Sequence, residues 1–260
     1  MHIQTLLPVL QQYWPVFPLV FMAGLVDAIA GGGGLISLPA YMLAGLSPHL
    51  AIGTNKLSSC MGTTLSTFRF VRSGYVRLQT ALVSVPFALF GSFRGARLNL
   101  LISNRVFKIL MLVILPVTAF VVLRTKALEP GRPPRSLRLT CILCAAIAFG
   151  VGVYDGFYGP GTGTFLILLL TGVAGLALKD ANGLTKIINL STNVAALAVY
   201  LASSQVLLGL GLAAGLCNIA GNWLGVSFFN RRGAAIVKPV MLFVLTVFMV
   251  RTVLELLGIL

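Results

Sequence analysis

The chain has 260 residues, of which 58% are hydrophobic and 9% are charged. Soluble domains carry about 25% charged residues, so this composition excludes an ordinary soluble protein and predicts an integral membrane protein. A net charge of +14 would favour nucleic-acid binding in a soluble chain, but here the basic residues gather at the ends of apolar segments, which is typical of topogenic charge and contacts to anionic lipid.

Ten apolar segments follow one another, five in each half of the chain. A membrane-spanning helix needs roughly 20 residues, so the length allows about eight to ten membrane segments. The second segment of each half is too short to span, and with the first it forms either a broken helix or a re-entrant hairpin. We therefore expect an all-α polytopic protein. The segments are about 15–30, 34–46, 50–71, 76–97, 105–124, 141–158, 162–176, 181–202, 205–228 and 235–257.

A glycine-rich motif lies between the first two segments of each half. The copy at Gly24–Gly34 has Asp27 before four glycines, and the copy at Gly152–Thr162 has Asp155 before a Gly-Pro-Gly break. Glycine permits the backbone angles of an unwound turn, and non-helical backbone inside a bilayer is tolerated only where protein or a water-filled cavity surrounds it. A duplicated break of this kind is typical of secondary transporters.

Each break precedes a short helix that we expect to begin near Gly34 or Gly163. The free N–H groups and partial positive charge of such a helix start suit a small oxyanion. The alternative is that the glycines only let helices pack closely. The residues expected to line the site here are Gly31, Gly32, Gly33, Gly34, Gly159, Gly161, Thr162 and Gly163.

The third segment of each half is polar for a membrane helix. Each carries a lysine with polar residues three and seven positions later, which places all three on one helix face. A central lysine costs about 2.5–3.5 kcal/mol on insertion scales unless an anion or an acid is its partner. The alternative is that it snorkels to the interface. The candidate substrate-binding residues are Asn55, Lys56, Ser59 and Thr63 in the first half and Lys186, Asn189 and Asn193 in the second.

Asp27 and Asp155 lie deep in apolar runs, just before the breaks. An intramembrane carboxylate is a functional hypothesis by default, so these acids could carry protons that couple transport, or pair with a lysine. The structural alternative is that each one accepts hydrogen bonds from free N–H groups of the unwound turn.

The halves align almost without gaps, with Lys56 opposite Lys186 and Gly91 opposite Gly221. We expect a first transmembrane repeat at 1–124, a basic, Pro-rich cytoplasmic loop at 125–139 and a second repeat at 140–260. The basic cluster that contains Arg72 has no charged counterpart near Ser204, which favours an inverted second repeat. Arg94, Arg97 and Arg105 do not fit this topology, so a parallel repeat is the alternative.

No catalytic or metal-binding set can be assembled from the sequence. His2 and His49 are isolated. The pair Cys141 and Cys144 has CxxC spacing, but an apolar run is not the context of a redox or metal motif. We therefore expect neither a cofactor nor an enzyme.

The motif residues resemble those of a known family. The runs Ala23–Pro39, Gly53–Leu57 and Tyr154–Gly163 are similar to signatures of the TauE/SafE family of membrane transporters, and the resemblance covers about residues 15–257. It implies a duplicated transporter of the bacterial cytoplasmic membrane, in a family linked to export or uptake of sulfite, sulfoacetate and related organosulfur anions. Pro160 and Thr162 stand where the first break has glycine, so the two half-sites are not chemically equal.

The sequence thus predicts a secondary transporter of a small anion that works by alternating access between two repeats. The alternative from another class is an anion channel with the same donor-lined path. A third hypothesis, an intramembrane enzyme, lacks a catalytic set. The expected partners are the anion and membrane lipids, including anionic lipids, without nucleic acid; a homodimer is left open.

Overall fold

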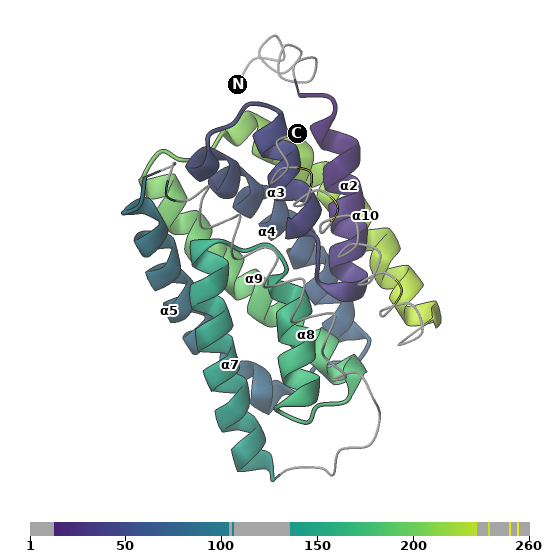
Figure 1. Cartoon of the computed structure of the whole chain (residues 1–260). Helices are drawn as coiled ribbons and strands as arrows, with labels where there is room; N and C mark the ends of the chain where they lie inside the picture. The colour runs from purple at the N-terminus through teal and green to yellow at the C-terminus, as the bar shows by residue number, and fades with distance from the viewer. Residues whose placement is uncertain are drawn as a thin grey trace.

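A computed structural model describes residues 13–103 and 136–232, together with Val106, Pro239, Val250 and Leu254. This part of the chain is all-helical and contains eight helices, four on each side of the gap (Figure 1). The segments expected at 105–124 and 235–257 lie outside the described residues, apart from those single positions, as does the loop up to residue 135.

The same sequence of helix lengths occurs in both halves. A helix of intermediate length is followed by a short one and then by two long ones. The helices are α2 (Val16–Ala30), α3 (Gly34–Leu43), α4 (Pro48–Arg72), α5 (Leu78–Leu100), α7 (Leu137–Phe157), α8 (Thr162–Gly172), α9 (Leu178–Ala202) and α10 (Leu208–Arg232).

The loop predicted at 125–139 is wrong at its C-terminal end. Helix α7 begins at Leu137, after Ser136 in an extended conformation, so Arg138 is helical rather than in a loop. Arg138 interrupts the apolar run, but arginine is a good helix former and this one is exposed at the helix end. The predicted apolar segment begins at residue 141 and therefore misses the first turn of α7, which contains Arg138.

Three of the described helices are long and apolar enough to cross a membrane, namely α7, α9 and α10. In each half the glycine break reverses the chain, so the first two helices form a hairpin. In the first half, Gly33 lies against Asp27 of α2. In the second, Phe165 of α8 packs edge-on against Tyr154 of α7, with ring centroids 5.4 Å apart. Figure 1 shows α3 in the upper part of the molecule and α8 in the lower part.

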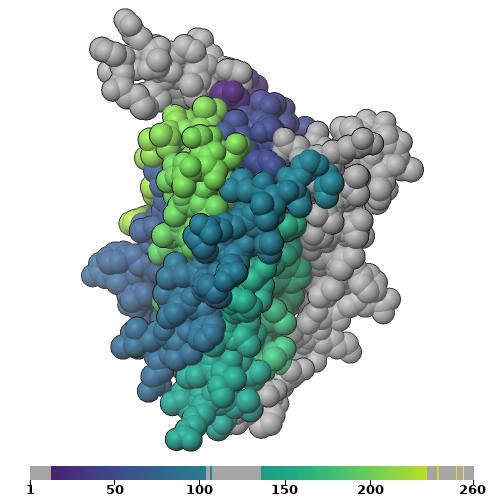
Figure 2. Space-filling model, turned by 90° about the vertical axis from the view of Figure 1, so that its left-hand side faces the viewer, coloured from purple at the N-terminus to yellow at the C-terminus, as the bar shows by residue number. Residues whose placement is uncertain are grey.

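Each hairpin is held by a helix from the other half. Helix α5 packs along α7, and α10 packs along α2. Gly91 lets α5 approach the backbone of Phe149, and Gly221 lets α10 approach the backbone of Phe21. Small residues at such positions allow membrane helices to come close together. Figure 2 shows α5 and α7 side by side along one face of the molecule.

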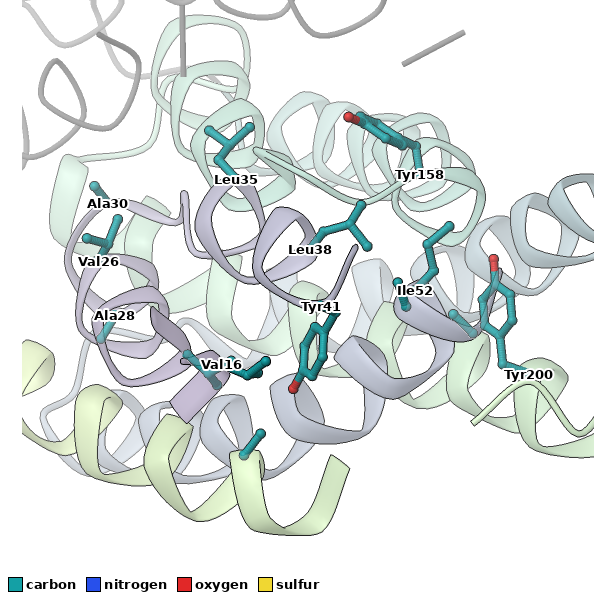
Figure 3. Close-up of a cluster of buried hydrophobic side chains, with 14 of the residues drawn as sticks. Val16, Val26, Ala28, Ala30, Leu35, Leu38, Tyr41, Ile52, Tyr158 and Tyr200 are labelled. Atoms are coloured by element: carbon teal, nitrogen blue, oxygen red, sulfur yellow. The ribbon is translucent and has the colours of Figure 1, made fainter. Parts of the chain in front are cut away.

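One hydrophobic core joins the two hairpins. Figure 3 shows Leu35 and Leu38 of α3 in the same cluster as Tyr158 and Tyr200 of the second half. Tyr41, also in this cluster, is fully buried and donates a hydrogen bond to Ser58 Oγ at 2.8 Å, which ties α3 to α4. This shared packing fixes the first break relative to the second.

Candidate functional site

The two breaks touch each other. Gly31 and Gly163 face one another so closely that a Cβ on either would overlap the backbone of the other. The Thr164 N–H donates to the Gly31 carbonyl at 3.1 Å, and the Thr164 hydroxyl donates to the Ala30 carbonyl at 3.0 Å. Gly31 and Gly161 have φ values of 75° and 80°, which favour glycine because an L side chain is strained there.

The carbonyl groups at the ends of α2 and α7 find partners on other helices. The last carbonyls of a helix have no partner within it, and inside a membrane each one left alone costs several kcal/mol. Side chains of other helices supply donors to three of these carbonyl groups, which lowers the cost of reversing the chain there. The pairs are Asn182 Nδ2 with Ile29 O (3.2 Å), Asn99 Nδ2 with Phe157 O (2.7 Å) and the Tyr200 hydroxyl with Gly156 O (3.3 Å).

Both candidate lysines are buried and paired across the halves. Lys56 is 2% exposed, and its Nζ donates to Asp155 Oδ2 at 2.6 Å and to Asn193 Oδ1 at 3.1 Å. Lys186 is fully buried, lies 3.6 Å from Asp27 Oδ2 and donates to the Asp27 carbonyl. The alternative in which these lysines snorkel to the interface is therefore wrong, because neither ammonium group reaches the surface.

The two carboxylates differ in how firmly they are held. Asp155 binds Lys56 through one oxygen and accepts from the Thr162 hydroxyl at 2.7 Å through the other. Asp27 Oδ2 has no hydrogen-bond partner among the described residues, and the Asp27 side chain is 13% exposed against 3% for Asp155. Asp27 is thus the looser acid of the two.

A cavity lies where the breaks meet, with about 420 Å³ of empty space including its mouth. The structure brings most of the predicted site residues together around it, from both breaks and from the polar faces of α4 and α9. These are Asp27, Gly31, Gly33, Gly34, Asn55, Lys56, Ser59, Thr63, Asp155, Gly159, Thr162, Gly163, Asn189 and Asn193.

Three predicted residues do not line the cavity. Gly32 and Gly161 belong to the turns, and Lys186 is buried behind Asp27. Lys56 therefore contributes the cationic side chain at the cavity wall in the part of the chain that the structure describes.

Sequence reasoning missed Ala23, Ser37 and Asn218, which also line the cavity. The Ser37 hydroxyl donates to the Gly33 carbonyl at 3.2 Å. Asn218 lies in α10, in the middle of an apolar run. Its signal was present in the sequence, since an amide in the middle of an apolar run needs a polar partner.

The charges around the cavity are balanced. Lys56 pairs with Asp155 and Lys186 pairs with Asp27, so the net charge of the four side chains is zero. The starts of α3 and α8 add partial positive charge. Some of their first N–H groups, those of Leu35, Thr162 and Thr164, already donate to carbonyl groups of the breaks. The cavity therefore favours an anion through the positive ends of α3 and α8 and through Lys56. The Lys56 ammonium group would then bind both Asp155 and the anion.

The match to known proteins covers almost the entire chain. The family model described as "Sulfite exporter TauE/SafE" matches residues 16–252. The chain belongs to the TauE/SafE family. The resemblance noted in the motifs is therefore confirmed, and it identifies this TauE/SafE protein as a membrane protein of a transporter family.

Relatives of this TauE/SafE protein carry transporter names. The chain is 34% identical over 232 residues to "Probable membrane transporter protein ORF9" of Sinorhizobium sp., covering 88% of this chain and 87% of the relative. It is 32% identical over 235 residues to "Probable membrane transporter protein YfcA" of Escherichia coli strain K12, covering 88% and 85%. No solved structure matches the chain.

Proposed function

We propose that this protein is a secondary transporter of a small anion, a sulfite, sulfoacetate or related organosulfur anion, in the bacterial inner membrane. One observation carries the proposal: the starts of two half-helices meet at a cavity that Lys56 lines. Helix starts and a lysine attract an anion, and the family description names sulfite. The solute leaves chemically unchanged, and no cofactor takes part.

The bound anion would sit beside Lys56. Asp155 and Asn193 hold the Lys56 ammonium group at the cavity wall, at 2.6 and 3.1 Å. Gly34 and Gly163 lie in the first turns of α3 and α8, so their N–H groups are available as donors. Ser59, Thr63 and Asn189 add hydroxyl and amide groups that orient the ligand.

Alternating access would rock one repeat against the other. We infer that the two halves, 1–124 and 140–260, are inverted repeats joined by a cytoplasmic loop. The packing supports a two-fold relation between the halves, because α10 holds the first hairpin as α5 holds the second. The inversion is supported by the short helices α3 and α8, which lie towards opposite ends of the molecule (Figure 1). Each ion pair crosses between the halves, so the pairs lie where such a motion would act. Exposed arginines at the helix ends, such as Arg72 and Arg231, would contact anionic lipid.

Asp27 is the acid that we propose as the proton-coupling group, and Asp155 is the structural one. An anion that enters a cavity whose side-chain charges already cancel leaves a net negative charge, which is costly in low dielectric. Protonation of Asp27 would remove that charge, and Asp27 is the looser acid. Both carboxylate oxygens of Asp155 already accept hydrogen bonds, one from Lys56 and one from Thr162.

Asp27→Asn should separate coupling from binding. We expect this variant to lose uptake driven by a proton gradient while it retains exchange of labelled for unlabelled anion across the liposome membrane. Asp155→Asn should lose both activities, because the Lys56 ammonium group would lose the carboxylate that holds it at the cavity wall. Equal loss of exchange in the two variants would contradict the division of roles.

Flux into proteoliposomes tests the function itself. We expect saturable uptake of sulfite or sulfoacetate that responds to a proton gradient, with sulfate as the comparison anion. Current that does not saturate and ignores the gradient would favour the channel alternative. Absence of flux and of exchange for all three anions would contradict the proposal.

A further inference from the structure

Asn218 reaches the proposed anion site from a helix that carries none of the other polar cavity residues. It lies in the middle of α10, is 4% exposed, and lines the same cavity as Lys56 and Asp155. Burying an amide in an apolar helix costs free energy unless each polar atom finds a partner. The orientation of this amide therefore decides what it can bind.

Asn222 fixes that orientation. Its Nδ2 donates to the main-chain carbonyl of Asn218 at 3.0 Å and to Asn218 Oδ1 at 2.8 Å. The main-chain carbonyl is an acceptor only, so the Asn222 atom that faces it must be the amide nitrogen. The Asn218 atom that meets the same nitrogen must then be its oxygen. The Nδ2 group of Asn218 is left as a donor for the cavity.

Two glycines on neighbouring helices make room for this pair. A Cβ on Gly62 of α4 would overlap Asn218 Oδ1, and a Cβ on Gly24 of α2 would come within 2.5 Å of the Asn218 carbonyl. Gly62 lies between Ser59 and Thr63, which both line the cavity. The Asn218 amide therefore packs against the polar face of α4.

Asn218 has no polar counterpart in the other half. In the register that pairs Gly91 with Gly221, the position equivalent to Asn218 is Ala88, a fully buried apolar residue. The other wall therefore lacks this donor, and the site is asymmetric about the breaks.

We propose that Asn218 is an anion-binding residue whose amide N–H₂ donates to an oxygen of the anion beside Lys56, and that Asn222 is its positioning residue. This inference rests on the proposed anion transport. A neutral donor at this wall binds the oxyanion without adding charge to a cavity whose ion pairs already cancel.

Sulfite binding to the purified, detergent-solubilised protein tests the inference, measured by isothermal titration calorimetry. Asn218→Ala should raise the Kd about tenfold, the effect of one hydrogen bond to a charged group. Asn218→Asp keeps the volume and the acceptor for Asn222 but turns a carboxylate towards the anion, so it should abolish binding. Asn230→Asp, the same change at an exposed position of α10, should leave the Kd unchanged.

A double-mutant cycle tests whether Asn222 acts on sulfite binding through Asn218. Asn222→Ala should weaken sulfite binding in the wild-type background and have no further effect on the Kd in the Asn218→Ala background, because the amide that it orients is gone. A merely structural Asn222 would lower the unfolding temperature in both backgrounds and leave both Kd values unmoved.

The outcomes separate the two proposals. Wild-type affinity in both Asn218 variants would overturn this inference and leave anion transport standing. Absence of sulfite, sulfoacetate and sulfate binding in the wild-type protein would overturn both.

Discussion

Lys56→Met should reduce anion transport at least about a hundredfold and destabilise the protein by about 3–5 kcal/mol, because it leaves the buried Asp155 carboxylate without its cation. The ammonium group is also the cationic side chain that we place against the anion. Flux in proteoliposomes and chemical unfolding in detergent measure the two effects separately.

The double variant Lys56→Met/Asp155→Asn separates the loss of transport from the loss of stability. It removes both charges of the pair, so we expect most of the stability to return while transport stays at background. The matched control is Lys186→Met/Asp27→Asn, which removes the other pair. Lys186 does not line the cavity, and Asn at position 27 keeps the side-chain volume while it removes a negative charge from the cavity wall, so this control should retain measurable anion binding. Near-wild-type transport by the Lys56 double variant would remove Lys56 from the site.

Gly163→Ala should destabilise the protein by about 3 kcal/mol or more and abolish transport. The added methyl group would overlap the backbone of Gly31, and a backbone cannot move aside as a flexible side chain can. The unwound segments would have to separate, and the cavity between them would lose its shape. The shift in the unfolding midpoint and the loss of flux measure the result.

Two other helical glycines provide the control for Gly163. Gly150 of α7 and Gly209 of α10 have no heavy atom within 4 Å of the position that a Cβ would take. Alanine is the better helix former by about 0.5–1 kcal/mol, so both substitutions should be neutral or slightly stabilising. If Gly163→Ala behaved as these two do, the breaks would not pack against each other.

The fold could largely be read from apolar runs and their interruptions. The eight described helices coincide with eight of the predicted segments, because a bilayer requires long apolar helices and glycine ends them where the chain must turn. The start of α7 was missed, since Arg138 is compatible with a helix but not with an apolar pattern.

The site was predictable where a residue type is costly in a membrane. Lys56 and Asp155 stood out for that reason, and the repeat register added Asn189 and Asn193. That Lys56 pairs with Asp155 rather than with Asp27 of its own half could not be foreseen, because it depends on how the hairpins pack. The repeat register did not point to Asn218, because its counterpart, Ala88, is apolar; only the cost of an amide in an apolar run could have identified it.

Locating a bound anion tests the central claim most directly. Selenite has the shape and charge of sulfite, and the anomalous scattering of selenium marks its position in a crystal of the protein. The proposed site predicts a selenium peak between the two breaks, with an oxygen within hydrogen-bond distance of Lys56 Nζ. A peak elsewhere, with the space between Gly34 and Gly163 empty at saturating selenite, would contradict it.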